Sequence, residues 1–252
     1  MNPSVPIIEA RNLTVRFGER TIFKNVSFTV NRGDILVILG GSGCGKSTLL
    51  RTLTGLNQPT EGQVFIAGED FTAATGEDRI RLLRKFGILF QSGGLFASMS
   101  LAENIALPLQ TYTNLTDQDI ETMITLKLGA VGLDGFQEFL PSEISGGMKK
   151  RAGLARAMAL DPEILFFDEP SAGLDPISSV SLDNLILNLN SALGTTMIVV
   201  THELDSINTI AQNALMLDRD AQGIIAIGTL DEVKSNTSNP RISHFFNRIA
   251  EE

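Results

Sequence analysis

A glycine-rich stretch, GGSGCGKST at residues 40–48, constrains the fold of this chain more than any other feature. It matches the pattern G-x-x-x-x-G-K-[ST] and lies between the apolar run ILVIL at 35–39 and the helix-like KSTLLRTLTGL. Glycines let a backbone wrap closely around a phosphate with its N–H groups pointing inward. A strand, this loop (the P-loop) and a helix in that order predict a nucleoside triphosphate site.

Every residue of the P-loop is a candidate for nucleotide binding. Lys46 would place a positive charge on the β- and γ-phosphates, and the Ser47 hydroxyl would complete the shell of a Mg²⁺ ion. The candidate residues are Gly40, Gly41, Ser42, Gly43, Cys44, Gly45, Lys46, Ser47 and Thr48. Cys44 is the only cysteine, so the chain has no internal disulfide. Its thiol is either reactive, with a pKa lowered by the helix start, or a small space-filling group.

Polar residues follow three further apolar runs. ILFFDEP at 164–170 predicts Asp168 as a Mg²⁺ ligand and Glu169 as the general base that activates a water molecule. A solvated acidic turn is the alternative, which explains one carboxylate after four apolar residues better than it explains two. MIVVTHE at 197–203 ends at His202, which we expect to contact the γ-phosphate. Gln91, in LFQSGGLF, can reach metal or water with its amide.

The pattern of apolar runs predicts an α/β fold with a parallel sheet covered by helices on both faces. Alternating segments before residue 33 indicate an N-terminal antiparallel β region, and GQVFIAG at 62–68 is a strand of the same kind. Between 97 and 160 strand signals give way to helical spacing, with caps expected at Ser100, Thr116 and Gly132. We therefore expect a core of 1–96 and 161–228, a helical subdomain at 97–160, and a tail at 229–252 that starts with a helix capped by Thr229.

Composition narrows the function classes. A net charge of −9 argues against a nucleic-acid surface, which needs a clustered basic face. The N-terminal MNPSVPIIEARN lacks a basic segment followed by an apolar one, so no secretory signal is expected. No apolar run approaches the roughly 20 residues of a membrane span.

A second glycine pair begins another helix-like segment, in ISGGMKKRAGLARA. Helix starts gather unpaired N–H groups and can bind phosphate, so Ser145, Gly146 and Gly147 are further candidate nucleotide ligands. The basic run KKR at 149–151 indicates a site for an anionic ligand, a solvated helix face, or an approach to the ATP phosphates.

The ordered motifs GGSGCGKST, Gln91, SGGM at 145–148, ILFFDEP, SAGLD at 171–175 and His202 resemble the nucleotide-binding subunits of ABC transporters over about residues 7–230. The resemblance implies a P-loop NTPase fold with a RecA-like core. It also implies ATP and Mg²⁺ as cofactors, with Ser47, Gln91 and Asp168 on the metal. Phe17 would stack on adenine, although by its sequence alone it can equally be a core residue.

This resemblance also explains why the chain has two phosphate-binding turns. Subunits of this family work as head-to-tail pairs, so Ser145 and Gly147 of one copy would face ATP on the P-loop of the other. Asp175, in SAGLD, would cross the same interface and support the catalytic geometry. Met148 departs from the glutamine usual there, which affects contacts of that side chain only.

The motifs also resemble the ATPase subunits of phospholipid transporters in Gram-negative envelopes. The partners implied are an integral membrane permease, a periplasmic MCE-type lipid-binding subunit and a small cytoplasmic STAS-domain protein, with the chain at the cytoplasmic face of the inner membrane. A soluble ABC ATPase acting on nucleic acid or ribosomes is the alternative, but such proteins usually carry coiled-coil insertions or two cassettes. A small-molecule kinase would have no use for SGGM or SAGLD.

Overall fold

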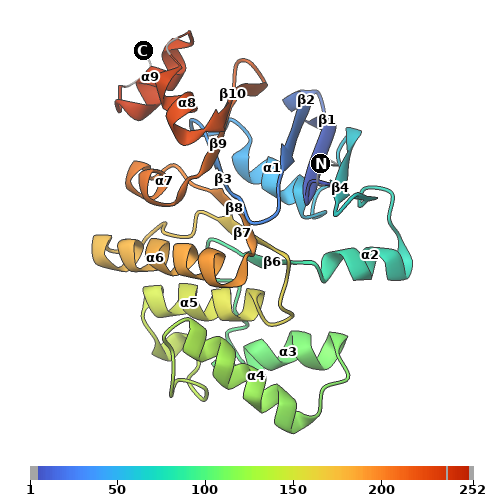
Figure 1. The fold of residues 1–252 in the computed structure, drawn as a ribbon, viewed down its shortest axis with the longest axis vertical. Helices are drawn as coiled ribbons and strands as arrows, with labels where there is room; N and C mark the ends of the chain where they lie inside the picture. The colour runs from blue at the N-terminus through green and yellow to red at the C-terminus, as the bar shows by residue number, and fades with distance from the viewer. Residues whose placement is uncertain (1–4, 237, 250–252) are drawn as a thin grey trace.

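The structure, a computed structural model, describes residues 5–236 and 238–249 (Figure 1). Its strands are β1 (Ile8–Phe17), β2 (Arg20–Val30), β3 (Ile35–Leu39), β4 (Glu61–Ile66), β5 (Glu69–Asp70), β6 (Phe86–Leu89), β7 (Ile164–Asp168), β8 (Thr196–Val200), β9 (Asn213–Asp218) and β10 (Gly223–Thr229). Its helices are α1 (Lys46–Leu53), α2 (Gly76–Leu83), α3 (Leu101–Tyr112), α4 (Asp117–Ala130), the 3₁₀ turn η1 (Pro141–Glu143), α5 (Gly146–Ala157), α6 (Pro176–Leu193), α7 (Leu204–Ile210), α8 (Leu230–Ser235) and α9 (Pro240–Phe246). This order confirms the predicted α/β class.

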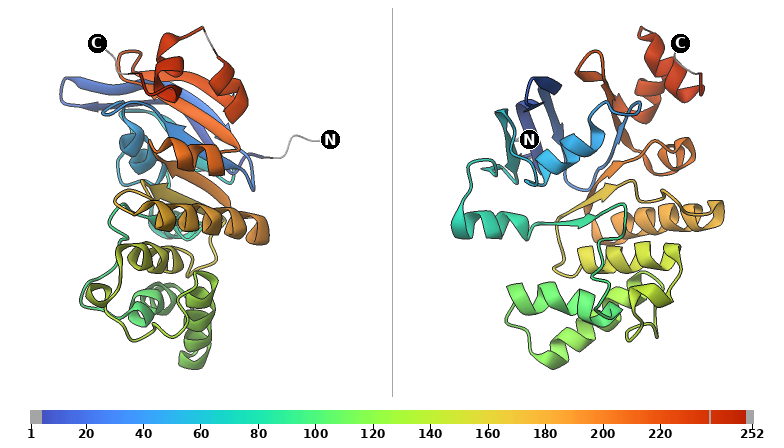
Figure 2. Two further views of the ribbon diagram at one scale, coloured as in Figure 1. Left: turned by 90° about the vertical axis from the view of Figure 1, so that its left-hand side faces the viewer. Right: turned by 180° about the vertical axis from the view of Figure 1, so that it is seen from behind.

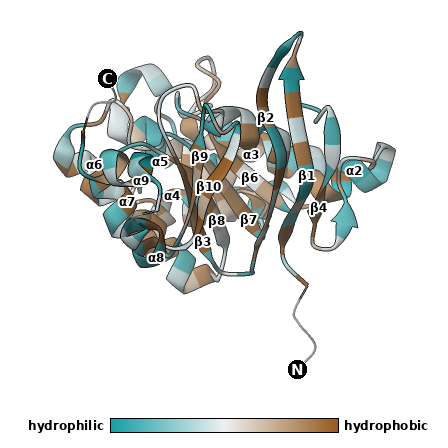
Figure 3. Ribbon diagram, turned by 90° about the horizontal axis from the view of Figure 1, so that it is seen from above, coloured by the Kyte–Doolittle hydropathy of each residue, from teal (hydrophilic) through white to brown (hydrophobic). Residues whose placement is uncertain are grey.

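The main sheet has the order β10-β9-β3-β8-β7-β6 among the described strands. All neighbours pair in parallel except β10, which runs antiparallel to β9. Every residue of β3, β7 and β8 is buried, because elements cover both faces of the sheet. Figure 3 shows the resulting hydrophobic colour along these central strands.

A second, antiparallel sheet of order β2-β1-β4-β5 covers one face of the main sheet together with α1. β1 and β2 form the hairpin expected for the N-terminal segment, with Phe17 opposite Arg20 at its turn. Side chains from both sheets, such as Phe23, Val64 and Phe166, share one buried core. The antiparallel sheet therefore packs in the same core as α1, the helix that follows the P-loop, and helps to hold that helix in position.

The opposite face is covered by α5, α6 and α7, with α3 and α4 beyond α5 at one end of the molecule (Figure 2). The chain between β6 and β7 is helical, as the sequence predicts. Ser100 and Thr116 cap α3 and α4, and in each case the side chain three residues later caps the cap residue in return. Gly132 follows the end of α4 with φ +69, a left-handed conformation that suits glycine.

The tail forms α8 and α9, which lie at the end of the molecule opposite α3 and α4 (Figure 1). Thr229 caps α8 as predicted. Arg241 pairs with Asp218 and Asp220, and so attaches α9 to the end of β9. Residues 1–4 of the expected core, and 237 and 250–252 of the expected tail, lie outside the described residues. Within the described chain, no helix combines the length and apolarity needed to cross a bilayer.

Candidate active site

Four strands of the main sheet end around one cleft. β3 leads into the P-loop, β6 precedes Gln91, β7 ends at Asp168 and β8 precedes His202. The cleft has a volume of ≈ 730 Å³ and is lined by residues 40–43 and 45–48 together with Gln91, Glu169 and His202. Because the carboxyl ends of parallel strands meet at one edge of a sheet, motifs far apart in sequence come together here.

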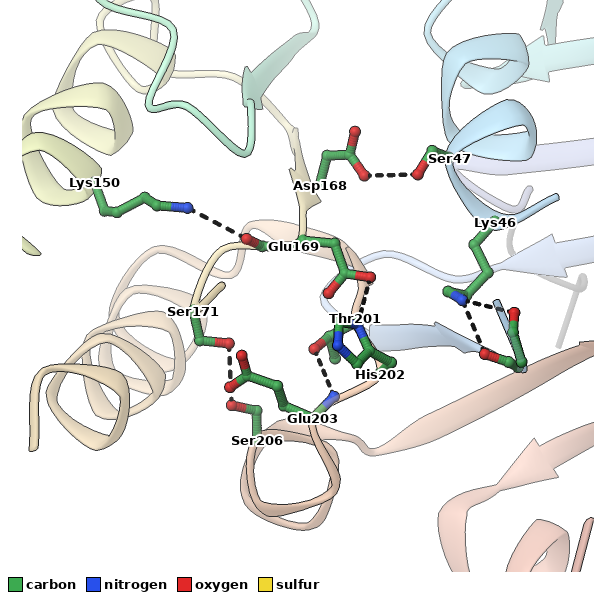
Figure 4. A network of polar contacts seen from close by, with 12 residues as sticks. Lys46, Ser47, Lys150, Asp168, Glu169, Ser171, Thr201, His202, Glu203 and Ser206 are labelled. Carbon is green, nitrogen blue, oxygen red and sulfur yellow. Dashed lines mark hydrogen bonds and ion pairs between the residues drawn. The ribbon is translucent and has the colours of Figure 1, made fainter. Parts of the chain in front are cut away.

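The P-loop depends on its glycines. Gly40 has φ +143, and a Cβ atom there would lie 2.2 Å from the carbonyl oxygen of Leu217. Gly45 adopts φ +105 directly before α1, where a side chain would meet Ile22. Lys46 folds back over the loop, and its Nζ donates to the carbonyl oxygens of Gly40 (2.8 Å) and Gly41 (3.1 Å) (Figure 4). The ammonium group therefore lies against the loop that would surround a phosphate.

Ser47 and Asp168 face each other across the cleft edge. The Ser47 hydroxyl donates to Oδ1 of Asp168 at 3.1 Å, and the Asp168 side chain is buried at the end of β7 (Figure 4). A hydroxyl and a carboxylate are hard oxygen donors that fit Mg²⁺, which commonly takes its remaining ligands from phosphate and water. These two residues therefore suit the predicted metal site, with the exposed Gln91 amide on the same cleft.

Glu169 and His202 form a pair beside the P-loop. Oε1 of Glu169 lies 2.9 Å from Nδ1 of His202 (Figure 4). The other carboxylate oxygen, Oε2, is buried and has no hydrogen-bond partner among the described residues. Glu169 also has φ +49, a strained conformation for a residue with a side chain. An acceptor held in this way at the cleft can take a proton from a water molecule.

Ser145 and Asp175 lie at helix starts outside this cleft. The Ser145 hydroxyl caps α5 by accepting from the Met148 N–H at 3.2 Å. Asp175 caps α6, and the hydrogen bond from the Ser178 hydroxyl holds the pKa of Asp175 below its ordinary value. Gly146 and Ser145 are exposed. One copy of the chain therefore does not bring the SGGM turn to its own P-loop.

Residues 23–172 match the protein-family model described as ABC transporter. The chain belongs to the ABC transporter family. Its fold is the P-loop ABC ATPase fold, with the parallel core, antiparallel β region and helical segment that the sequence predicted.

Curated relatives in the ABC transporter family cover nearly the whole chain. The intermembrane phospholipid transport system ATP-binding protein MlaF of Escherichia coli K12 is 40% identical over 245 residues, which are 97% of this chain and 90% of MlaF. The probable ribonucleotide transport ATP-binding protein mkl of Mycobacterium tuberculosis H37Rv is 40% identical over 240 residues, 95% of this chain. The match spans only 66% of the length of mkl.

A solved ABC cassette has the same architecture. The ATP-binding cassette MJ0796, in a dimeric post-hydrolysis state bound to ADP and Pi, superimposes with a TM-score of 0.79. The match has 28% sequence identity and covers 88% of this chain and 98% of the cassette.

Phe17 is the residue that the family resemblance assigns to adenine stacking, and it is not among the residues that line the cleft. Its side chain is 55% exposed at the end of β1, so the alternative interpretation as a core residue is wrong. The cleft lining includes Arg20 and Ile22, which follow Phe17 across the hairpin turn. Stacking of Phe17 on adenine stays a prediction.

Cys44 points into the core. The side chain is 2% exposed, and burial raises the pKa of its thiol despite the nearby Lys46. A raised pKa keeps the thiol protonated and unreactive, so the structure favours the space-filling role. Any contribution of Cys44 to nucleotide binding would come from its backbone.

Lys150 corrects the interpretation of the basic run as a solvated helix face. The residue is 6% exposed, and burial lowers the pKa of its ammonium group. Its neighbours Lys149 and Arg151 are half-buried, and Arg151 donates to the Ser181 hydroxyl at 2.6 Å. The position of α5 between the main sheet and α4 turns the middle residue of the run inward.

Sequence reasoning missed three residues that line the cleft, namely Arg20, Ile22 and Phe245. Arg20 and Ile22 begin β2, and their place beside Phe17 in the hairpin is the signal that could have identified them. Phe245 belongs to α9 in the tail, and no local pattern connects it to a loop 200 residues earlier in the sequence.

Proposed function

We propose that this chain is the ATP-hydrolysing motor subunit of a membrane ABC transporter that moves phospholipids between the inner and outer membranes of a bacterium. One observation carries the proposal: Lys46, Ser47, Glu169 and His202 line one cleft, with Asp168 hydrogen-bonded to Ser47 at its edge. A phosphate cradle, a hard-oxygen pair and a general base at the cleft are what ATP hydrolysis needs.

The chemistry follows from these side chains. ATP binds with its phosphates in the P-loop, where backbone N–H groups and Lys46 offset the negative charge. Bound Mg²⁺, held by Ser47, Asp168 and Gln91, would neutralise charge that develops on the phosphates. Oε2 of Glu169 orients a water molecule and takes its proton, while His202 holds the carboxylate through Oε1 and reaches the γ-phosphate.

The site is completed by a second copy of the chain. Ser145, Gly146 and Gly147 lie outside the cleft of their own copy, and phosphoryl transfer needs donors on more than one side of the phosphate. In a head-to-tail pair, this turn would close over the nucleotide on the partner's P-loop, and Asp175 would lie at the same interface. The dimeric state of MJ0796 supports such an assembly.

The substrate and partners are proposed from relatives. MlaF belongs to an intermembrane phospholipid transport system and matches over 90% of its own length. The chain would act at the cytoplasmic face of the inner membrane, bound to an integral permease. A periplasmic MCE-type lipid-binding subunit and a small STAS-domain protein complete the proposed complex.

Ribonucleotide transport is the competing substrate class, because mkl is equally identical in sequence. We favour phospholipid because the match leaves about a third of mkl uncovered but little of MlaF. A soluble ATPase acting on nucleic acid is not favoured, given the net charge of −9.

The test is to extract the native complex from membranes and identify its subunits and bound small molecules by mass spectrometry. Phosphate release from ATP is then measured in vesicles that contain phospholipid, with and without added ribonucleotide. We expect an integral subunit, bound phospholipid and ATP-dependent phosphate release. Recovery of the chain without a membrane subunit, or with ribonucleotide in place of lipid, would contradict the proposal.

A further inference from the structure

Helix α5 carries a buried lysine that touches the backbone of the catalytic base. Lys150 is 6% exposed, and its Nζ donates to the carbonyl oxygen of Glu169 at 3.3 Å. Figure 4 shows the side chain crossing from α5 to the end of β7. This contact joins the helix that begins with the SGGM turn to the residue that would activate water.

The backbone of Glu169 needs such support. Its φ of +49 is unfavourable for a residue with a side chain, so surrounding contacts must hold it there. The Glu169 N–H donates to the Val200 oxygen at 2.9 Å, and the Glu169 carbonyl accepts from the Ala172 N–H at 3.2 Å and from Lys150. Of these contacts, only the one from Lys150 comes from α5.

The charge of Lys150 is stabilised by acidic groups around Glu169. A buried ammonium group costs free energy unless acceptors and opposite charges surround it. The carboxylates of Glu203, Glu169 and Asp168 all interact favourably with it. The ammonium group therefore interacts with the ends of β7 and β8 rather than with solvent.

The other end of this connection is the SGGM turn. Lys150 lies five positions after Ser145, or about 7.5 Å along a helix that rises 1.5 Å per residue. Ser145 caps the helix and Gly147 lies in its first turn, against Ser178 of α6. A helical segment this short moves as one body, so a shift at the turn also moves Nζ of Lys150.

We propose that Lys150 is a positioning residue that couples the conformation of Glu169 to the state of the SGGM turn in the same copy. This inference rests on the proposed head-to-tail ATPase. There, the turn of one copy faces the nucleotide of one site, while Glu169 of that copy serves the other site. Lys150 thus makes hydrolysis at each site depend on nucleotide at its neighbour.

Substitution of Lys150 in the assembled complex gives the first test. Lys150→Met keeps the length of the side chain but removes its donors, and we expect kcat to fall about tenfold or more while KM for ATP changes little, because a misplaced base slows chemistry rather than binding. Lys150→Gln keeps an N–H donor, so it should be faster than Lys150→Met. Lys127→Met is the matched control. It removes a lysine of α4 that is also largely buried and that pairs with Asp161, and it should keep wild-type kcat.

Mixed dimers test the coupling itself. One copy carries Lys46→Ala, which removes ATP from its P-loop, and the other is either wild type or Lys150→Met. For the wild-type copy and for the Lys150→Met copy, single-turnover hydrolysis at the intact P-loop is measured in this mixed dimer. Each rate is compared with that of the same copy in a dimer whose two P-loops are both intact. We expect loss of the neighbouring nucleotide to slow the wild-type site severalfold and to leave the Lys150→Met site unchanged.

Different results would refute the proposed function and the role of Lys150. A wild-type complex that releases no phosphate refutes the proposed function. A wild-type complex that hydrolyses ATP refutes only the inference if folded Lys150→Met has wild-type kcat, if Lys150→Gln is no faster than Lys150→Met, or if the empty neighbour slows both sites by the same factor. Melting temperatures of all variants show whether they fold.

Discussion

Oε1 of Glu169 lies 2.9 Å from Nδ1 of His202, while Oε2 of the same carboxylate is buried and has no hydrogen-bond partner among the described residues. One oxygen of the carboxylate is thus held by His202, and the other is buried without a partner among the described residues. A buried acceptor without a partner is costly, and such groups persist where a ligand or water completes them. We propose that the attacking water is the group that completes Oε2 of Glu169 when ATP is bound.

Glu169→Gln is expected to abolish turnover and keep ATP binding. Glutamine has nearly the same shape but cannot take a proton, and loss of a general base typically costs about 10²- to 10⁴-fold in rate. Phosphate release by the complex and equilibrium binding of ATP measure the two effects. Full hydrolysis by Glu169→Gln would refute the assignment of the base.

Complementation between two inactive copies tests whether the site is shared. Lys46→Ala impairs the P-loop, and Ser145→Tyr obstructs the turn that would face the partner's nucleotide. Each variant alone should neither associate in the presence of ATP nor hydrolyse it. In a mixed dimer, the P-loop of the Ser145→Tyr copy meets the intact turn of the Lys46→Ala copy, so one complete site forms and ATP-dependent association returns.

The control for this experiment is Ser145→Thr, which keeps the hydroxyl that caps α5. We expect it to retain activity, whereas loss of the cap alone would cost about 1 kcal/mol of stability. Size-exclusion chromatography with and without ATP follows the association. Wild-type turnover by a solitary Ser145→Tyr copy would show that the turn has no role in catalysis.

Local patterns predicted the parts of the fold that depend on neighbouring residues. The caps at Ser100 and Thr116 were predictable because a capping box is complete within four residues. The buried strands were predictable because apolar runs such as ILVIL can only be buried on both faces. The ends of these strands also predicted which residues meet in the cleft.

Long-range packing explains what the sequence could not predict. Three adjacent charges at 149–151 are typical of a solvated helix face, yet Lys150 is buried because α5 contacts the end of β7. Phe245 reaches the cleft because Arg241 attaches α9 beside the end of β9. Neither contact leaves a periodic signal in the chain.

Gly153→Ala is expected to destabilise the protein and to disturb Gln91. A Cβ atom at Gly153 of α5 would lie 2.1 Å from the carbonyl oxygen of Gly93, in the loop that follows Gln91. Overpacking of this kind costs about 1–3 kcal/mol, and relief requires the loop to move. Denaturant unfolding measures the loss, and ATPase activity should fall with it.

Gly223→Ala is the matched control for that substitution. The nearest atom to its Cβ would be the Lys24 carbonyl oxygen at 3.6 Å, an ordinary contact at the start of β10. We expect little change in the free energy of unfolding. Equal stability of the two alanine variants would show that the loop at Gly93 yields without cost.

Glu163→Gln is expected to lower stability at neutral pH but not in acid. Glu163 precedes β7 and pairs with Lys85 (2.6 Å) and with Arg32, which hold the pKa of its carboxyl below the ordinary 4.5. Because the folded pKa is lowered, the stabilisation is complete above the unfolded pKa and disappears as pH falls through the folded value. The pairs are partly exposed and screened, so we expect a loss of about 1 kcal/mol or less at pH 7.

Urea unfolding of wild type and Glu163→Gln across acid and neutral pH measures this difference. The gap between the two free energies of unfolding should close as pH falls below the folded pKa of Glu163, and it should shrink in high salt at pH 7. Glu121→Gln, which removes the same charge from the exposed face of α4, should show a smaller gap. A gap that stays constant through the acid range would mean that the charge of Glu163 does not stabilise the N-terminal ends of β3, β6 and β7.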